Sequence, residues 1–265
     1  MNSKIKATLR KFLSVVLAAL TVFGCAGAAF ADGSDASGTL NGVNWVYTAA
    51  DKTLVLSGSG TLDASSDAFS TSAWNAEYVK IGADVDIKSG LVFNHFNFVK
   101  AFEVDADSKY LCSPDSMLMS KDQTVLLKYP SRNNEFSFYT IPDTVKTISY
   151  AAFEYAPLKT VFLNDGLETI EGFAFSNSSL LYITIPGTVT SIGQSVLAQC
   201  SSITKVTFEE GVTAIPTSAF DRCRNLETVN LPDSLTTIGD IAFWDCTKLK
   251  SLKLPKNLRE FKGTP

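Results

Sequence analysis

The sequence contains a single histidine, His95, among 265 residues. This scarcity excludes most metal sites and catalytic triads that depend on imidazole groups. Charged side chains are also few, at 19%, whereas 45% of the residues are hydrophobic, so the chain is no disordered polar polymer and can form a sizeable core. Removing the four basic residues of segment 1–31, which has no acidic residue, leaves 19 basic and 27 acidic side chains. The resulting net charge of about −8 argues against a nucleic-acid-binding protein.

The segment 1–31 has the pattern of a secretory signal peptide. A basic start is followed by an apolar stretch and by the small-residue cleavage pattern Ala29-Phe30-Ala31. We therefore expect a mature chain that begins at Asp32 and is secreted or displayed at the cell surface. Two alternatives stay open: an uncleaved membrane anchor, since residues 12–30 carry no charge, and a lipoprotein in which Cys25 carries the lipid.

A pattern of 22 to 23 residues repeats through the second half of the chain. Apolar residues that end a short extended segment recur at Ile141, Leu163, Ile185, Phe208, Leu231 and Leu254. Twelve residues after each of the first five stands a large apolar residue, at Phe153, Phe175, Leu197, Phe220 and Phe243. Because no single repeat can enclose its own apolar side, consecutive repeats must stack, and equivalent side chains should form columns in one shared core.

Residues 226–246 show how one repeat is built. Apolar residues two positions apart share one face of a strand that a proline ends. A second extended piece ends at Gly239, which we expect to adopt a turn conformation that other residues resist. Phe243 and Cys246, three residues apart, then share one side of a helical turn. The sequence thus predicts a repeat solenoid, mainly β, with short helical or 3-10 turns.

The N-terminal part follows this pattern less regularly. The repeat extends back to about residue 76, with a hairpin inserted at about 105–137. Before it, alternating apolar and polar residues in 32–75 are typical of a β-hairpin that covers the first repeat. We therefore divide the chain into a signal peptide, 1–31, an N-terminal β cap, 32–75, and a solenoid, 76–265.

The repeat has the form Leu-x-x-Val-x-Leu-Pro-x-x-Leu-x-x-Ile-Gly-x-x-Ala-Phe-x-x-Cys in residues 226–246. It resembles the repeat of the BspA-like leucine-rich repeat family of bacterial and protist surface proteins. The resemblance is specific from about 138 to 261 and looser from 76 to 137. It implies a leucine-rich repeat solenoid outside the cell, often in adhesion or host contact, with no catalytic residues to carry over. Ala156 and Ser178 replace the cysteine, and no Leu-Pro-x-Thr-Gly signal for covalent wall attachment is present.

Three cysteines, Cys200, Cys223 and Cys246, recur every 23 residues and should stack. Side chains stacked in this way point in one direction about 4.8 Å apart, whereas a disulfide needs Cβ atoms that face each other. We expect buried free thiols that act as small apolar fillers. Since no Cys-x-x-Cys accompanies them, we expect no metal site, and Cys112 has no evident mate.

Other chemically active residues have simple interpretations. His95 falls where other repeats carry polar residues, which indicates a solvated loop and not a catalytic base. The pairs Asp84/Asp86 and Asp105/Asp107 are spaced like calcium ligands, but neither run continues with the glycine and glutamate of an EF-hand. We expect no metal and no cofactor. A hydrolase that uses Asp105 and Asp107 is the least favoured hypothesis, because no nucleophile, base and orienting group can be assembled around them.

The polar side of the first strand in each repeat is the candidate binding surface. Aromatic residues near a cation are typical of binding hot spots, so we expect a protein or glycan ligand on this concave strand face. The residues are Thr160, Phe162, Tyr182, Thr184, Lys205, Thr207, Thr228, Asn230, Ser251 and Lys253. Two alternatives stay open. The first is that threonine and aromatic residues occur here only because they suit strands, without a binding role. The second is a structural module whose copies stack end to end.

Overall fold

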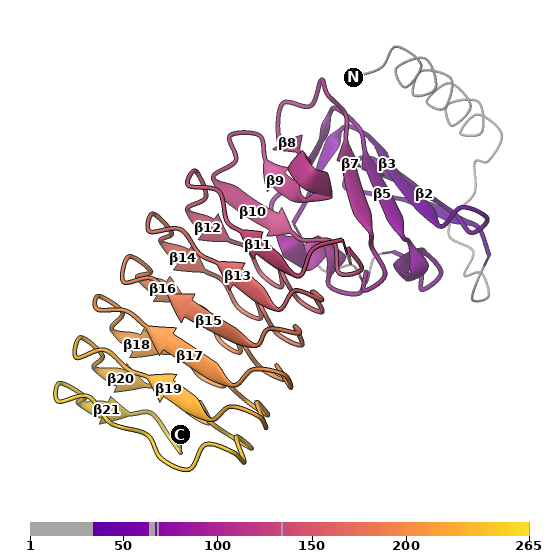
Figure 1. The fold of residues 1–265 in the computed structure, drawn as a ribbon. Coiled ribbons are helices and arrows are strands. Elements are labelled where there is room, and N and C mark those ends of the chain that lie inside the picture. The colour runs from indigo at the N-terminus through magenta and orange to yellow at the C-terminus, as the bar shows by residue number, and fades with distance from the viewer. Residues whose placement is uncertain (1–33, 64–66, 68, 134, 265) are drawn as a thin grey trace.

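The computed structural model describes residues 34–63, 67, 69–133 and 135–264. The chain winds into stacked coils that follow one another in chain order toward the C-terminus (Figure 1). The strands of successive coils pair in parallel, which confirms the predicted β-solenoid. The predicted signal peptide, 1–31, lies outside the described residues.

A five-stranded sheet, which we call the N-terminal sheet, stands at one end of the stack (Figure 1). Its strands, in spatial order, are β1 (Ala36–Leu40), β2 (Val43–Thr48), β3 (Thr53–Gly58), β5 (Tyr78–Ile81) and β7 (Ala101–Val104). The first three are antiparallel, and β5 and β7 continue in parallel. The sequence analysis missed β1, although Asn41 and Gly42, both with positive φ, form the two-residue hairpin turn that Asn-Gly favours.

The first strands of the later coils form a second five-stranded sheet, the front sheet. It consists of β11 (Phe138–Thr140), β13 (Thr160–Phe162), β15 (Tyr182–Ile185), β17 (Lys205–Phe208) and β19 (Thr228–Asn230), all parallel. Residues that point inward, such as Ile183 and Val206, are buried and lie opposite each other. Since the period of a strand is two, the alternate residues form the solvent side.

The second, shorter strands of the coils form the adjacent side of the solenoid. One sheet has the order β16 (Ser191–Ile192), β14 (Thr169–Ile170), β12 (Thr147–Ile148), β10 (Val125–Lys128), β9 (Leu118–Ser120) and β8 (Leu111–Cys112). Another contains β18 (Ala214–Ile215), β20 (Thr237–Ile238) and β21 (Glu260–Phe261), and β4 (Gly60–Leu62) pairs with β6 (Val85–Ile87). Strand β10 is antiparallel to β9 but parallel to β12, so it joins a hairpin to the stack.

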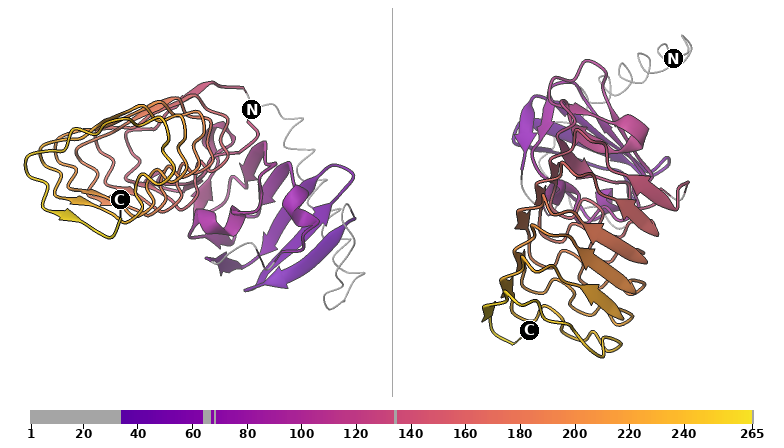
Figure 2. Two further views of the ribbon diagram at one scale, coloured as in Figure 1. Left: turned by 90° about the horizontal axis from the view of Figure 1, so that it is seen from below. Right: turned by 60° about the vertical axis from the view of Figure 1, so that its left-hand side comes forward.

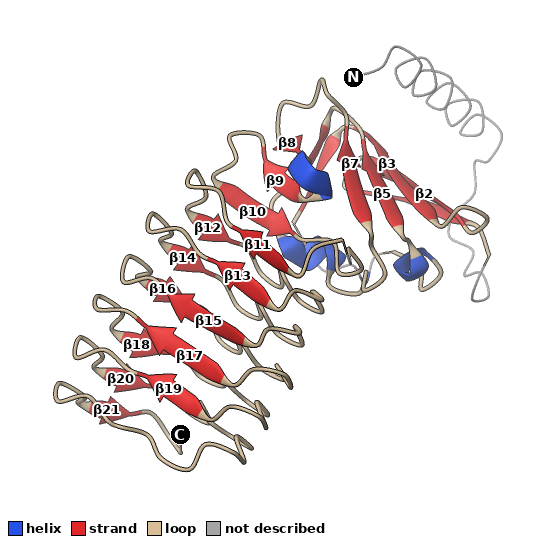
Figure 3. Ribbon diagram, in the orientation of Figure 1, coloured by secondary structure: helices blue, strands red, loops and turns tan. Residues whose placement is uncertain are grey.

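In the coils after residue 140, the third side consists of turns and not of the helical turn that the sequence predicts (Figure 3). In one coil Ala151 and Tyr155 have left-handed φ values of 52° and 59°, which interrupts a right-handed helix. The amides of Ala151, Phe153 and Tyr155 instead donate to carbonyls of the next coil, at distances of 3.1, 2.7 and 3.2 Å. This side therefore adds a third set of bonds between coils.

Short 3-10 helices occur only in the N-terminal half of the described chain. They are η2 (Ala73–Asn75), η3 (Gly90–Phe93) and η4 (Pro114–Ser116). Within the described residues, no helix has the length and apolar character needed to cross a membrane.

The predicted columns of apolar side chains are present in the core. Phe153 and Phe175 stack with ring centroids 5.2 Å apart, and Phe220 and Phe243 do the same. Tyr129 extends the column by one coil, because its ring stacks on Phe153 at 5.3 Å. The coils overlie one another when the stack is seen nearly end-on (Figure 2, left).

The role predicted for Gly239 is wrong. Its φ is not among the positive values that require glycine. A Cβ at this position would lie 2.4 Å from the backbone nitrogen of Thr217 and 2.5 Å from the carbonyl carbon of Pro216. Glycine is needed here because two coils approach closely, and not because of a turn conformation.

The last coil departs from the repeat. Residues 251–255 form no strand, so the front sheet ends at β19, and Ser251 and Lys253 lie outside its hydrogen-bonded ladder. The prediction that Ser251 and Lys253 lie on a further strand of this sheet is therefore wrong. Leu254 and Phe261, at positions that are buried or partly buried in earlier coils, are 49% and 45% exposed because the last coil packs against a neighbour on one side only.

Candidate binding surface

The solvent side of the front sheet, called the front face below, carries three exposed aromatic rings on consecutive strands. Phe138, Phe162 and Tyr182 are 59%, 48% and 46% exposed, respectively. The rings of Phe138 and Phe162 touch edge to face, with centroids 6.2 Å apart. Tyr182 lies in register with Lys205 on the next strand, so the aromatic group borders a cation.

Thr160 does not belong to the accessible surface that the sequence predicts. It is 6% exposed, because its two register partners, Phe138 and Tyr182, carry larger side chains on the same face and cover it. Counting alternate residues along the strand placed Thr160 on the correct side but could not show this coverage.

Phe138 was missed by the sequence analysis, although it is the most exposed of the three rings. The signal was present, since it lies 22 residues before Thr160 and Thr140 lies 22 residues before Phe162. The face therefore begins one coil earlier than predicted. Phe136, 49% exposed, lies just before the same strand.

Polar side chains cover the C-terminal half of the front face. The amide of Asn230 donates to the hydroxyl oxygen of Thr207 at 3.1 Å. The polar residues on strands β15 to β19 are Thr184, Lys205, Thr207, Thr228 and Asn230, and β11 contributes Thr140 at the other end of the face. Together with the rings they form a surface whose backbone is held by parallel strand pairing from β11 to β19.

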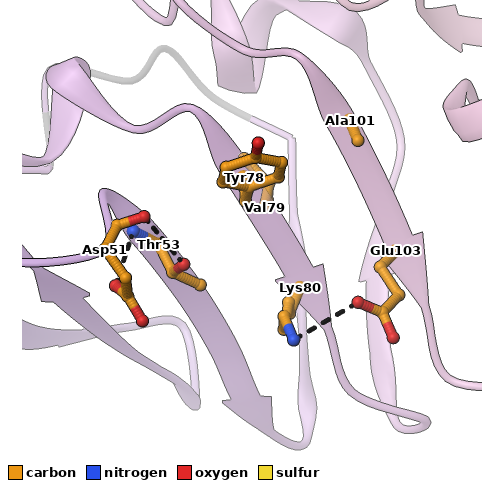
Figure 4. A pocket seen from close by; sticks show the side chains of 7 residues that line it. All are labelled: Asp51, Thr53, Tyr78, Val79, Lys80, Ala101 and Glu103. Carbon is orange, nitrogen blue, oxygen red and sulfur yellow. Dashed lines mark hydrogen bonds and ion pairs between the residues drawn. The ribbon is translucent and has the colours of Figure 1, made fainter. Parts of the chain in front are cut away.

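A hollow lies on the N-terminal sheet (Figure 4). Its volume is about 290 Å³, and its lining includes Asp51, Thr53, Tyr78, Lys80 and Glu103. Tyr78 is 43% exposed, and Lys80 Nζ lies 3.3 Å from Glu103 Oε2. The sequence analysis did not identify this hollow, because the first coils fit the repeat less closely.

The acidic pairs have structural partners. Asp105 Oδ1 accepts a hydrogen bond from the amide of Asp107 at 2.9 Å, and the carboxylate of buried Asp86 pairs with Lys88 at 2.6 Å. His95 Nε2 lies 2.9 Å from Asp67 Oδ1, and its ring contacts that of Trp74 at a centroid distance of 4.5 Å and a tilt of 32°. Among the residues in the described ranges, no group of three or more His, Cys, Asp or Glu side chains is arranged to hold a metal ion.

The stacked thiols are free, as predicted, but they are more than apolar fillers. Cys200, Cys223 and Cys246 each donate an S–H bond to a backbone carbonyl of the preceding coil, at 3.0, 3.1 and 3.1 Å. Burial raises the pKa of the Cys246 thiol to about 12. A thiol in this state stays protonated at neutral pH and is a poor nucleophile.

Lys128 is a buried cation at the end of β10, where the hairpin joins the stack. It is 1% exposed, and its Nζ donates to the carbonyl of Ala151 at 2.6 Å. Burial lowers the pKa of Lys128 to about 8, although nearby Glu154 opposes this shift. Burial also raises the pKa of Glu154. Neither residue was predicted from the sequence to be a buried charged group.

Lys128→Met should change how stability depends on pH. Between the folded pKa of about 8 and the unfolded value of 10.5, the unfolded wild-type chain binds one proton more than the folded chain. The contribution of Lys128 to the free energy of unfolding therefore rises with pH in this window, by about 3 kcal/mol. We expect the stability difference between wild type and Lys128→Met to shift by about this amount from pH 7.5 to 10.5 in urea denaturation.

Comparison with Lys128→Met is essential, because Tyr129 and Cys246, whose pKa values are raised to about 12, act in the opposite direction above pH 9. Lys121→Met, at an exposed position in the hairpin turn, is the control and should show no such shift. A constant difference between wild type and Lys128→Met over this range would show that Lys128 is not neutral in the folded protein.

The parallel coils, the apolar columns and the strand-turn pattern define a leucine-rich repeat solenoid. The family model for the BspA type leucine-rich repeat region matches six copies, over residues 129–250 and 213–264, which together exceed half of the chain. The protein belongs to this family. Proteins with this fold are typically interaction scaffolds and not enzymes. No curated protein matches the chain significantly.

Among solved structures of bacterial proteins, one matches the chain with a TM-score above 0.5 and two others match with lower scores. A leucine-rich repeat protein from Eubacterium ventriosum has 19% identity and a TM-score of 0.54, with 89% of this chain and 94% of that chain covered. The pneumococcal vaccine antigen PcpA has 22% identity and a TM-score of 0.44, with 72% and 55% covered. A leucine-rich cell surface protein from Faecalibacterium prausnitzii has 17% identity and a TM-score of 0.38, with 90% and 86% covered.

Proposed function

We propose that this protein binds an extracellular protein or glycan through the front face. The observation that supports this function is the group of exposed rings, Phe138, Phe162 and Tyr182, beside Lys205 on a rigid sheet. Exposed aromatic residues next to a cation are the side chains that dominate binding energy in known interfaces. The signal-like segment 1–31 supports secretion or display at the cell surface, and adhesion or host contact is the role we assign to the interaction.

The test uses the chain from residue 32, which contains every described element. It is screened against extracellular matrix proteins and glycans, and the affinity of each ligand is compared with that of the Tyr182→Ala/Lys205→Ala variant. We expect the variant to bind at least about tenfold more weakly, since loss of a hot spot costs about 2 kcal/mol or more and about 1.4 kcal/mol corresponds to a factor of ten. The control is Trp244→Ala, which removes a 58% exposed ring from the turn side. Equal affinities for wild type and the double variant would refute binding at the front face.

We propose no catalytic role for the acidic pairs. The carboxylate of Asp105 is already engaged by the amide of Asp107 within its own turn. Hydrolase activity that disappears in Asp105→Asn would overturn this proposal.

Self-assembly is a second candidate function, and the last coil supports it. Leu254 and Phe261 expose apolar surface there, and β21 occupies the outer position of its sheet. An exposed strand edge with apolar neighbours can pair with another chain. End-to-end stacking predicts that the sedimenting mass rises with protein concentration and falls in Phe261→Lys. A constant monomer mass would exclude it.

A further inference from the structure

The front face differs in charge from the rest of the chain. The sequence has 27 acidic and 23 basic residues, yet no carboxylate occurs among the solvent-facing residues of β11, β13, β15, β17 and β19. Lys205 stands on β17, and exposed Lys253 follows two coils later at the equivalent of Thr207. Within the described part of the chain, no ion pair involves either lysine. The face therefore offers Lys205 to an anionic ligand. Lys253 lies beyond its last strand, where, after the larger effect of Lys256, it also helps to lower the pKa of the Asp233 carboxyl.

The uncharged side chains on this face suit sugar hydroxyl groups. Thr184, Thr207 and Thr228 carry hydroxyls that both donate and accept hydrogen bonds, and the Asn230 amide does the same. The rings of Phe162 and Tyr182 offer flat apolar surfaces on which the C–H face of a sugar ring can pack. An extended peptide, in contrast, gains most of its affinity by pairing with a free strand edge, and the strands between β11 and β19 are already paired on both sides.

The arrangement of these groups is linear. Parallel strands in register lie about 4.8 Å apart, so equivalent side chains form straight rows across the sheet. One row runs through Phe138, Thr160, Tyr182, Lys205 and Thr228. A polymer lying across the strands thus meets aromatic rings first and then a cation and hydroxyl groups.

We propose that the front face binds a linear acidic polysaccharide, with sugar rings packed on Phe162 and Tyr182 and acidic groups held by Lys205 and Lys253. This inference rests on the proposed function and specifies its ligand class. Carboxylate and sulfate groups present the same chemistry to a lysine, which acts as a point charge and not as a geometric fork.

The hollow on the N-terminal sheet supplies an internal contrast. Tyr78 is 43% exposed, close to the 46% of Tyr182, but its neighbouring cation, Lys80, is paired with Glu103 (Figure 4). An acidic ligand would meet the carboxylate there. Tyr78→Ala is therefore a matched control for Tyr182→Ala.

The experiment measures binding of the chain from residue 32 to four immobilised probes: heparin, which is sulfated; polygalacturonate, which is carboxylated; neutral dextran; and collagen, a protein. We expect binding to at least one of the two acidic polysaccharides and none to dextran. Tyr182→Ala should weaken it about tenfold or more, and Lys205→Gln should weaken it and reduce its dependence on salt concentration. Tyr78→Ala and Lys262→Gln, an equal charge change outside the front face, should leave the affinity within about twofold of wild type.

The outcomes separate the two proposals. Binding to collagen alone, if it is lost in Tyr182→Ala, would support the front face as the binding surface. It would overturn the proposal that the ligand is an acidic polysaccharide. Equal binding to dextran and to the acidic polymers would also overturn the proposed ligand class, because the acidic groups would then contribute nothing. An equal loss of affinity in Lys262→Gln and Lys205→Gln would overturn it too, because the position of the positive charge would then not matter. A ligand whose affinity is unchanged in Tyr182→Ala and Lys205→Gln would refute both proposals. Circular dichroism of each variant ensures that a loss of binding is not a loss of fold.

Discussion

Phe175→Ala is expected to lower the free energy of unfolding by about 3–5 kcal/mol, the usual cost of removing a buried phenylalanine ring. Phe175 has no exposed surface, and its ring stacks on Phe153 at 5.2 Å and 14°. Its carbonyl also accepts the S–H bond of Cys200 in the next coil. The cavity would open in the shared core between coils, where the surrounding backbone is held by bonds on three sides and cannot collapse easily.

Equilibrium unfolding in urea measures this loss, and hydrogen exchange locates it. Because each coil contacts only its neighbours, protection should fall most in the coils on either side of Phe175 and least in the N-terminal sheet. Phe162→Ala is the control: it removes the same ring from the same solenoid, but from a site 48% exposed, and should cost less than about 1 kcal/mol. Similar losses in both variants would contradict the column as the source of stability.

The columns of apolar side chains could be predicted from the sequence because, in a stack of coils, residues one repeat apart occupy equivalent positions in neighbouring coils. Residues 22 or 23 apart must lie one above another once neighbouring coils share a core, so Phe153, Phe175 and Phe220 were assigned correctly without coordinates of any kind. The same reasoning predicted the buried free thiols. The position of Tyr129 in the column was not predicted, because it lies at the end of the inserted hairpin. Its spacing from Phe153 is 24 residues and does not match the period.

Features that depend on neighbouring side chains could not be read from the period. The burial of Thr160 follows from the size of Phe138 and Tyr182 on either side, and a repeat pattern contains no information on coverage. The S–H bonds of the cysteines depend on where the carbonyls of the preceding coil point. The position of Lys253 outside a strand reflects the loss of the strand ladder at residues 251–255, which the repeat pattern does not show.

Glu171 illustrates a departure that only the structure explains. It occupies the position that Gly193 and Gly239 hold in their coils, and the glycine of its own coil, Gly172, follows one residue later. The Glu171 carboxylate accepts hydrogen bonds from the Tyr150 amide at 2.7 Å and from the Ser149 hydroxyl at 3.2 Å. In this coil a side chain accepts hydrogen bonds from the preceding coil. In the next coil the backbone at Gly193 lies close to the backbone of the preceding coil instead.

Gly193→Ala should therefore be among the most destabilising single-atom additions in the protein. A Cβ at residue 193 would lie 2.2 Å from the nitrogen of Gly172, 2.6 Å from the carbonyl carbon of Glu171 and 2.7 Å from the Cα of Gly172. All three are backbone atoms, which cannot rotate away as the end of a flexible side chain can. Relief requires the two coils to separate, which stretches the 2.8 Å bond from the Gly193 amide to the Ile170 carbonyl. We expect a loss of about 3 kcal/mol or more.

Gly172→Ala is a matched control on the opposite side of the same contact. Its Cβ would meet the Gln194 carbonyl oxygen and the Tyr150 ring at 3.4 Å, which is ordinary contact, and its φ is not in the left-handed region. It should be neutral or stabilise by up to about 1 kcal/mol, because alanine restricts the unfolded chain more than glycine does. Thermal and urea unfolding of the two variants decide the matter. If Gly193→Ala were as stable as Gly172→Ala, close backbone approach would not be the reason for glycine at position 193.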